Sequence, residues 1–289
     1  MVGLDYPNDA ASFKSRNLFL PKTLGVYFAQ QSRSFIFVRK DYTEVKCFFP
    51  QRRILKKIGI LGGMSWESSS KYYRQLNEGV RDRLGGLHNA RSVMVTVDFE
   101  KVERLQHEER WDEVWHYLAQ EAKTLELAGA DFLIIACNTV HRVASQIEAG
   151  LSIPLLHIVD TVVNRLHEMG VERVGLLGTR LTMEGTYYHE KLEAAGIEVF
   201  VPEVKSRRYL QQLIFKRMCV GTFLQRDVEK VVDVIHAFEA RGAEAVILGC
   251  TEFGILLQHA KTPIPCVDSV DCHIEQTIQL ALADHIEDI

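Results

Sequence analysis

The sequence of 289 residues has no apolar run approaching the roughly 20 residues that a membrane-spanning helix needs. It also lacks an excess of positive charge, because 34 Lys and Arg stand against 38 Asp and Glu. We therefore expect neither a membrane nor a nucleic acid among its partners. With 47% hydrophobic and 25% charged residues, the chain has the composition of a globular protein, and its length suggests about two domains.

Motifs for metals, disulfides and nucleotides are missing as well. No two of the six cysteines are spaced as C-x-x-C, and no Cys and His pairs have the spacing of a zinc site. No secretion signal is evident, so we expect reduced thiols, a cytoplasmic location and no metal. The glycine motifs fit neither a dinucleotide fingerprint nor a P-loop, and no nucleotide is implied.

The first 56 residues differ in composition from the rest and are expected to form an extension outside the core. Residues 1–55 are rich in aromatic side chains and hold nine Lys or Arg against four Asp or Glu. Those acids make a transit peptide a poor fit. Within this segment, "SFIFVRKDYTEVKCFF" predicts a short hairpin that turns near Lys40 and Asp41.

From Lys57 onward, short apolar strands alternate with helical patterns, which predicts an α/β fold with parallel strands covered on both faces. The segment from Trp66 to Leu84 has apolar residues at helical spacing, including Tyr72 and Tyr73, and stops at a pair of glycines. Further strands are expected at residues 91–99 and 131–137, with a helix at residues 110–129 between them.

The pattern then repeats. "GILG" beginning at Gly59 returns as "GLLG" beginning at Gly175, an offset of 116, and Cys137 returns as Cys250, an offset of 113. Two motifs at nearly one offset indicate a duplication of whole domains. We predict two pseudo-symmetric, doubly wound parallel-sheet domains of flavodoxin-like type, at residues 57–160 and 161–267, with a last helix at 268–289 packing back on the first domain.

Cys137 and Cys250 each end an apolar strand. Ligands of open parallel sheets bind beyond the carboxyl ends of the strands, so facing domains would bring both thiols to one cleft. A thiolate and a thiol on opposite faces of a tetrahedral carbon suit stereochemical inversion. A predicted helix follows each cysteine, and its N-terminus would lower the thiol pKa and bind a substrate carboxylate. Short polar neighbours stand at the same mouth, namely Asn138, Thr139, Thr251 and Glu252, the last as a partner for a substrate ammonium.

Structural interpretations compete with these functional ones. A single cysteine at a strand end is usually a packing residue, but the equivalence of Cys137 and Cys250 in the repeat favours function. His141 could tune the Cys137 thiol or could simply pack in its helix. Gln106 stands in a polar stretch that reads as a solvated loop. The cysteines without repeat context are expected to be structural or incidental: Cys47, Cys219, Cys266 and Cys272.

The motifs "GILGGMSWESS", "ACNTVH" and "LGCTE" resemble those of the aspartate/glutamate racemase family, from about Lys57 to the end of the chain. The resemblance implies two α/β domains, a homodimer, and racemisation of free amino acids, most often aspartate or glutamate, without pyridoxal phosphate, metal or other cofactor. It also implies Cys137 and Cys250 as the catalytic pair. Six further positions match the family's substrate site: Met64, Gln106, Asn138, Thr139, Thr251 and Glu252.

The chain also departs from the family pattern. Related sequences tend to have a Lys or Arg near Tyr209 that binds the side-chain carboxylate of the substrate, whereas here Arg207 and Arg208 lie nearby in the sequence. An amino acid with a neutral side chain is therefore an alternative substrate. Two further alternatives are a fold-related decarboxylase or isomerase, and an amino-acid-binding protein without catalysis.

Overall fold

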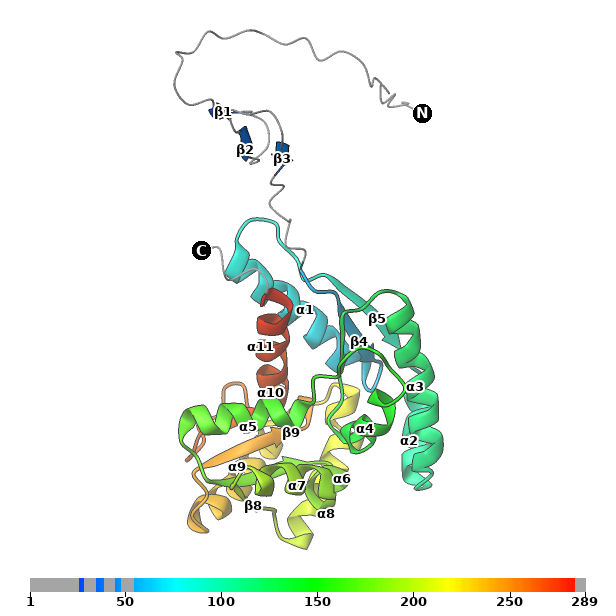
Figure 1. Cartoon of the computed structure of the whole chain (residues 1–289). Helices are drawn as coiled ribbons and strands as arrows, with labels where there is room; N and C mark the ends of the chain where they lie inside the picture. The colour runs from blue at the N-terminus through cyan, green and yellow to red at the C-terminus, as the bar shows by residue number, and fades with distance from the viewer. Residues whose placement is uncertain (1–25, 29–34, 39–44, 48–54, 284–289) are drawn as a thin grey trace, which may run out of the picture. The chain divides into compact units, whose positions relative to one another are not determined.

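The computed structural model describes residues 26–28, 35–38, 45–47 and 55–283. The chain divides into two units, Met1–Arg53 and Ile54–Ile289 (Figure 1). In the first unit, β1 (Val26–Phe28), β2 (Phe35–Val38) and β3 (Val45–Cys47) form an antiparallel sheet in the order β1-β2-β3. The pairing of β2 with β3 matches the predicted hairpin, and its turn near Lys40 lies outside the described residues.

The second unit contains two parallel sheets, one of three strands and one of four, and three strands are arranged in the same way in both. In the first sheet, β4 (Ile58–Gly62) lies between β5 (Ser92–Thr96) and β6 (Phe132–Ile135). In the second, the order is β10-β9-β7-β8, with β7 at Arg173–Gly178, β8 at Glu198–Phe200, β9 at Ala245–Gly249 and β10 at Cys266–Asp268.

The two sheets are related by the predicted duplication. Strands β4, β5 and β6 have the same neighbours as β7, β8 and β9. Leu155 makes an isolated parallel bridge to Leu133 of β6, in the place where β10 pairs with β9. The predicted α/β fold with parallel sheets is thus confirmed.

Helices surround both sheets. The first half contains α1 (Trp66–Leu84), α2 (Phe99–His107), α3 (Trp111–Leu127), the 3-10 helix η1 (Thr139–Val143), α4 (Ala144–Glu148) and α5 (Ile158–Met169). The second half contains α6 (Arg180–Glu184), α7 (Thr186–Ala194), α8 (Val204–Lys216), the 3-10 helix η2 (Met218–Val220), α9 (Gln225–Ala240), α10 (Thr251–Leu256) and α11 (Ser269–Leu282).

Helix α1 shows how local sequence sets an element. The Ser65 side chain accepts a hydrogen bond from the backbone N–H of Ser68 and so caps the first turn, and Gly85 ends the helix. Tyr72, Leu76 and Val80 are buried on one face, where each contributes about 1.5–3 kcal/mol of burial energy. The expectation that Tyr73 belongs to this face is wrong, because it is 58% exposed.

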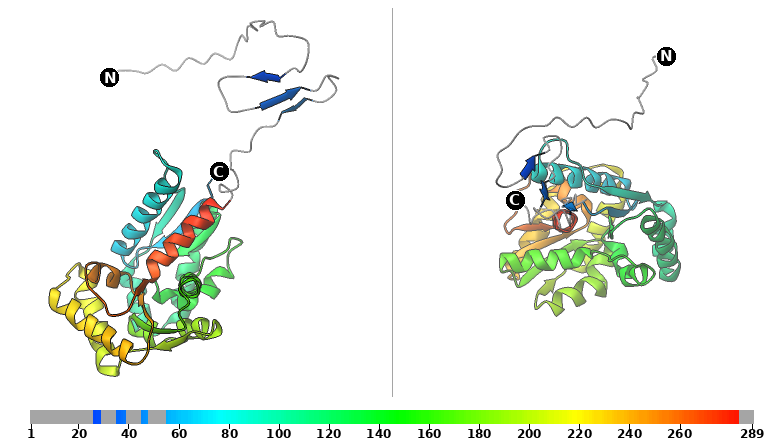
Figure 2. Two further views of the ribbon diagram at one scale, coloured as in Figure 1. Left: turned by 90° about the vertical axis from the view of Figure 1, so that its left-hand side faces the viewer. Right: turned by 45° about the horizontal axis from the view of Figure 1, so that its top comes forward.

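The last helix joins the two halves of this unit. Helix α11 lies beside α1 and α5, as Figures 1 and 2 show from different sides. Its buried residues Ile274 and Ile278 share a hydrophobic cluster with Tyr72 and Leu76 of α1. The division of this unit into two domains at the predicted boundaries stays a prediction. None of the helices in the described part of the chain is long and apolar enough to cross a membrane.

Candidate active site

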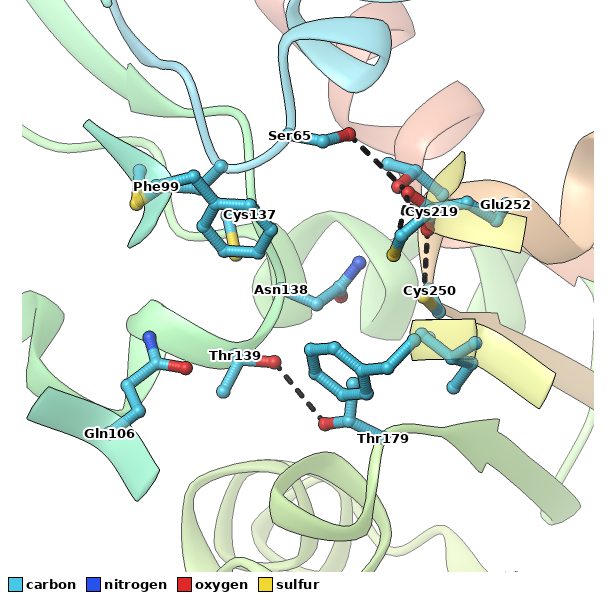
Figure 3. Close-up of a pocket in the computed structure, with 15 residues that line it drawn as sticks. Ser65, Phe99, Gln106, Cys137, Asn138, Thr139, Thr179, Cys219, Cys250 and Glu252 are labelled. Carbon is cyan, nitrogen blue, oxygen red and sulfur yellow. Dashed lines mark hydrogen bonds between the residues drawn. The ribbon is translucent and has the colours of Figure 1, made fainter. Parts of the chain in front are cut away.

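The carboxyl ends of both sheets border one cavity of about 40 Å³ (Figure 3). The two cysteines of the repeat lie on opposite sides of this cavity in the figure, with Asn138 between them. All eight residues predicted from the sequence line it: Met64, Gln106, Cys137, Asn138, Thr139, Cys250, Thr251 and Glu252. The sequence thus indicated the residues that the fold brings together here.

Cys137 follows β6 and begins the turn into η1. Backbone N–H groups of Thr139 and Val140 point at its sulfur and act to lower its pKa. The predicted helix after this cysteine is present: it begins as the 3-10 helix η1 and continues as α4 from Ala144.

Cys250 follows β9 and is the N-cap residue of α10, as expected. Its Sγ donates to Glu252 Oε2 at 2.8 Å, and Thr251 Oγ1 donates to the same oxygen at 2.7 Å. Weaker contacts reach the other carboxylate oxygen from Ser65 Oγ at 3.5 Å and Cys219 Sγ at 3.8 Å. Glu252 is therefore directed at the thiol rather than standing free to receive a substrate ammonium.

The pKa values of both thiols are raised, which corrects the expectation that helix N-termini lower them. Desolvation raises the pKa of Cys137 to about 11, and the two backbone N–H groups offset only part of that effect. Desolvation, followed by the negative charge of Glu252, raises the pKa of Cys250 well above its ordinary value. Both groups are thus held as protonated thiols at neutral pH.

Asn138 holds the two halves of the site together. Its Nδ2 donates to Ser269 Oγ at 3.0 Å, and its Oδ1 accepts from Tyr188 Oη at 2.8 Å. Its backbone carbonyl accepts from Tyr187 Oη at 3.2 Å. The side chain lines the cavity, but its amide is already satisfied by α7 and α11. Neighbouring Thr139 reaches across similarly, with its Oγ1 3.2 Å from Thr179 Oγ1.

The glycine turn after β4 places Met64 and Ser65 at the cavity. Gly63 has φ +96°, and a Cβ there would lie 2.4 Å from the backbone oxygen of Val97. Its N–H donates to Ser69 Oγ at 2.8 Å. Only glycine fits this conformation and contact, so the turn that directs Met64 and Ser65 depends on it.

Gln106 lies on α2 and not in a loop, which corrects the sequence interpretation. The helix is capped by Asp98, whose side chain accepts from the Glu100 N–H. The helix was missed because the sequence around Gln106 is polar, and α2 buries only Val102 and Leu105. The half-buried Gln106 amide faces Thr139 across the cavity in Figure 3.

Seven lining residues were not identified from the sequence. Thr179 and Ser65 could have been found, because each follows a "GILG"-type motif of the repeat. Cys219, expected to be structural or incidental, lies on the cavity wall. No local motif marks it. The others are Phe99, Ile214, Phe215 and Gly249.

The basic residues near Tyr209 point elsewhere. Arg207 Nη1 bonds Glu184 Oε1 at 2.8 Å, and Arg208 is exposed. Tyr209 Oη donates to Asp227 Oδ1 at 2.8 Å. None of these side chains lines the cavity.

His141 is buried behind the site rather than in it. Its Nδ1 is 2.8 Å from the carbonyl oxygen of Cys137, and its ring packs edge-on to His157 and His273. Burial lowers its pKa well below the ordinary value, so it is neutral. Among the residues that the structure describes, no group of three or more His, Cys, Asp or Glu could hold a metal ion.

A family comparison agrees with this architecture. The model of the Asp/Glu/Hydantoin racemase family matches residues 61–277, about three quarters of the chain. The chain belongs to this family. The match begins within β4, ends within α11 and includes both cysteine motifs.

Individual racemases of the family show the same relationship. A broad specificity amino-acid racemase, RacX of Bacillus subtilis, is 27% identical over 176 residues, 60% of this chain and 74% of that protein. A solved Yersinia pestis protein, described as a proposed Asp/Glu racemase, is 37% identical with a TM-score of 0.74 over 79% of this chain and all of that one. An aspartate racemase homologue from Pyrococcus horikoshii is 32% identical with a TM-score of 0.70, covering 78% and 99%.

Proposed function

We propose that this protein racemises a free amino acid without a cofactor, with Cys137 and Cys250 as the two acid/base groups. The observation that carries the proposal is the position of the two thiols. They end equivalent strands of the two duplicated sheets and line one cavity from opposite sides (Figure 3). RacX, a relative that acts broadly on amino acids, supports this reaction class.

The proposed reaction needs one thiolate and one thiol at a time. The thiolate removes the Cα proton from one face of the substrate, and the thiol on the other side donates its proton to the opposite face. After inversion the first group is the thiol and the second is the thiolate, so the reverse reaction starts from the product. Proton number is conserved, and no oxidant or second substrate is needed.

The resting site must first produce a thiolate, since both thiol pKa values are raised. Glu252 Oε2 is a hydrogen-bond acceptor for the Cys250 proton and lies 2.8 Å from the sulfur. Transfer to this carboxylate would form the Cys250 thiolate. Cys137 has no such carboxylate partner among the described residues, and the N–H groups of Thr139 and Val140 would stabilise its thiolate.

The substrate would lie between the sulfurs, in contact with residues that the family resemblance assigned to binding. Gln106 and Thr139 offer an amide and a hydroxyl at one end of the cavity. Met64 also lines the cavity, beside the glycine turn. Thr251 and Glu252 border the Cys250 side, where Glu252 Oε2 accepts from both Cys250 and Thr251. Asn138 lies between the two cysteines and is held by Ser269 and Tyr188.

Single serine variants test the two-thiol reaction. Cys137→Ser and Cys250→Ser should each reduce racemisation by at least about 10²-fold, because a serine hydroxyl is a far weaker acid than a thiol and is not deprotonated to a usable base at neutral pH. Purified enzyme would be incubated with L-amino acids in D₂O, with Cα deuterium followed by proton NMR and the D-form by chiral chromatography.

Cys266→Ser is the matched control, because Cys266 is a half-buried thiol of β10 that does not line the cavity. This variant should keep wild-type racemisation. Undiminished formation of D-amino acid by either Cys137→Ser or Cys250→Ser would overturn the two-thiol mechanism.

A further inference from the structure

The charges around the cavity bear on the substrate side chain, and the inference that follows rests on the proposed racemase function. Among the described residues that line the cavity, Glu252 is the one carboxylate, and no Lys, Arg or His lines it. During the proposed reaction this negative charge moves from Glu252 to one of the two catalytic sulfurs, which becomes the thiolate. The site therefore presents negative charge to whatever binds between the sulfurs.

Three basic side chains on the neighbouring elements are committed to other carboxylates. Arg217 precedes η2, the element that brings Cys219 to the cavity, and its Nη2 lies 3.0 Å from Asp227 Oδ1. Arg207 on α8 pairs with Glu184 at 2.8 Å. Lys71 on α1 contacts both Asp268 and Asp271, at 2.9 and 3.0 Å.

A dicarboxylic amino acid fits this environment poorly. A zwitterionic amino acid with an uncharged side chain has no net charge, whereas aspartate and glutamate carry one additional negative charge on the side-chain carboxylate. In a partly buried site that extra charge is repelled by the one negative charge that Glu252 and the two catalytic thiols carry between them, and it loses hydration without gaining a cation. The backbone N–H groups near Cys137 can stabilise a thiolate or an α-carboxylate, but they do not supply a second anion site.

The remaining walls of the cavity are apolar and favour an apolar substrate side chain. Phe99 at the start of α2, and Ile214 and Phe215 near the end of α8, line the cavity together with Met64. Ile214 is almost wholly buried in the core cluster of the second half, so this wall is firmly held. An aliphatic side chain can be covered by these groups without loss of hydrogen bonds.

We propose that the site accepts amino acids with small, uncharged side chains in preference to aspartate and glutamate. The preference for small side chains follows from the closely set walls: a space of about 40 Å³ must open to admit any amino acid, and a longer side chain needs a wider opening. Lysine and arginine are excluded by their length, and Glu252 Oε2 already accepts hydrogen bonds from Cys250 and Thr251.

The test is a substrate panel with the intact protein. L-Ala, L-Ser, L-Met, L-Asp, L-Glu and L-Lys would each be followed by Cα deuterium exchange and chiral chromatography. The expected result is a kcat/KM for the best uncharged substrate at least about tenfold above those for Asp and Glu. A preference for Asp, Glu or Lys would overturn the specificity inference and leave racemisation standing. Retention of every Cα proton across the panel would instead contradict the proposed function itself, and the specificity with it.

A charge-introducing variant tests the physical cause. Phe215 is half-buried on the cavity wall, and Phe215→Arg would bring a cation to it. The ratio of kcat/KM for Asp to that for Ala should rise about tenfold in Phe215→Arg. Phe215→Leu removes the ring without adding charge and should leave the ratio within about twofold of wild type. An equal rise in both variants, or no rise in a folded Phe215→Arg, would overturn the electrostatic explanation.

Discussion

The Glu252 carboxylate receives side-chain contacts from four residues, two of them at hydrogen-bond distances below 3 Å. Its position is set by α10, which places residue 252 two residues beyond the N-cap Cys250 and turns its side chain back over the sulfur. The result is a buried thiol–carboxylate pair on one side of the cavity. The Cys137 side has backbone N–H groups instead. The two thiolates are therefore supported by different groups: a carboxylate accepts the proton of Cys250, whereas backbone N–H groups donate to the sulfur of Cys137.

Replacing Glu252 by Gln should make Cys250 more acidic. The negative charge of Glu252 raises the pKa of this thiol, so its removal lowers that pKa, although burial still holds it above the ordinary range. We expect alkylation of Cys250 by iodoacetamide in Glu252→Gln to reach its half-maximal rate at lower pH than in wild type, as measured by mass spectrometry of the labelled peptide.

Racemisation should fall in the same variant by about 10²-fold, because the acceptor of the Cys250 proton is lost. Glu190→Gln, on the outer side of α7, is the matched control and should change neither property. An unchanged alkylation profile for Cys250 in Glu252→Gln would show that the carboxylate does not control this thiol.

At the scale of elements, the turn between β4 and α1 has a backbone conformation that only glycine fits. Gly63 combines a positive φ with close contact to the backbone of Val97, whereas a Cβ added at Gly86, where φ is +57°, would have nothing within 4 Å. Comparing substitutions at Gly63 and Gly86 therefore separates the free-energy cost of a positive φ from the cost of the clash with Val97. This distinction matters because Met64 and Ser65 follow directly and line the cavity.

Gly63→Ala should destabilise the fold by roughly 2–4 kcal/mol, and Gly86→Ala by roughly 1 kcal/mol, since only the first adds a backbone clash to the strained angle. Urea unfolding followed by circular dichroism measures both free energies. Gly63→Ala should also lose racemase activity under conditions where it remains folded. Equal destabilisation by the two variants would show that the contact with Val97 relaxes at no cost.

Helices η1 and α10 show that equivalent positions of a duplication need not form equivalent structures. Both follow a cysteine at a strand end, but Thr139–Val143 winds as a 3-10 helix while Thr251–Leu256 is α-helical. In the first case Asn138 is held by Tyr188 and Ser269 from the second half and the last helix. Contacts of that kind come from tertiary packing, so the sequence pattern could not distinguish the two turns.

Across the whole molecule, three histidines from distant segments meet where the halves join. His273 of α11 lies with its Nε2 2.9 Å from the Leu156 carbonyl oxygen and its Nδ1 2.8 Å from Tyr72 Oη. Burial lowers the pKa of His273 to about 4 and, together with the charge of Lys191, that of His157 to about 4. All three rings, His141 included, are therefore neutral at pH 7.

Acid should destabilise the fold through these groups. A histidine whose folded-state pKa lies below its unfolded value of about 6.5 stabilises the native state fully above that pH. Between about pH 6.5 and 4 the unfolded chain binds more protons, and each such histidine removes roughly 1.4 kcal/mol of stability per pH unit. Urea unfolding at steps from about pH 7 to 4 should show this loss.

His273→Gln should make stability fall less steeply with decreasing pH, because one histidine with a lowered pKa is removed. It should also lower the stability at pH 7, because the hydrogen bonds to Tyr72 and Leu156 change. His236→Gln, an exposed position of α9, should leave the steepness unchanged. A pH dependence identical in His273→Gln and wild type would mean that other groups control the acid sensitivity.

The cavity also has a consequence for the motion of the whole unit. A space of about 40 Å³ suffices for water but not for an amino acid. The two halves, or the segments of α2 and α8 that line the cavity, must therefore separate before a substrate can bind between the thiols.

The sequence by itself determined what depends on local pattern. The periodicity of strands and helices depends on neighbouring residues in the sequence. The repeat of "GILG" and of the two cysteines predicted the duplicated parallel sheets. The two thiols at equivalent strand ends followed from the same pattern, because the carboxyl ends of parallel strands share one edge. The eight predicted lining residues lie in or beside these motifs, apart from Gln106, which came from family resemblance and was placed in a loop.

Tertiary structure alone decided the environment of those residues. Cys219, Ile214 and Phe215 reach the cavity from segments with no motif, because packing of α8 and η2 on the second sheet carries them there. The raised thiol pKa values also depend on burial and on Glu252, neither of which a helix-start pattern reveals. Desolvation and charge depend on everything within a few ångströms in space, and only the folded chain establishes which residues those are.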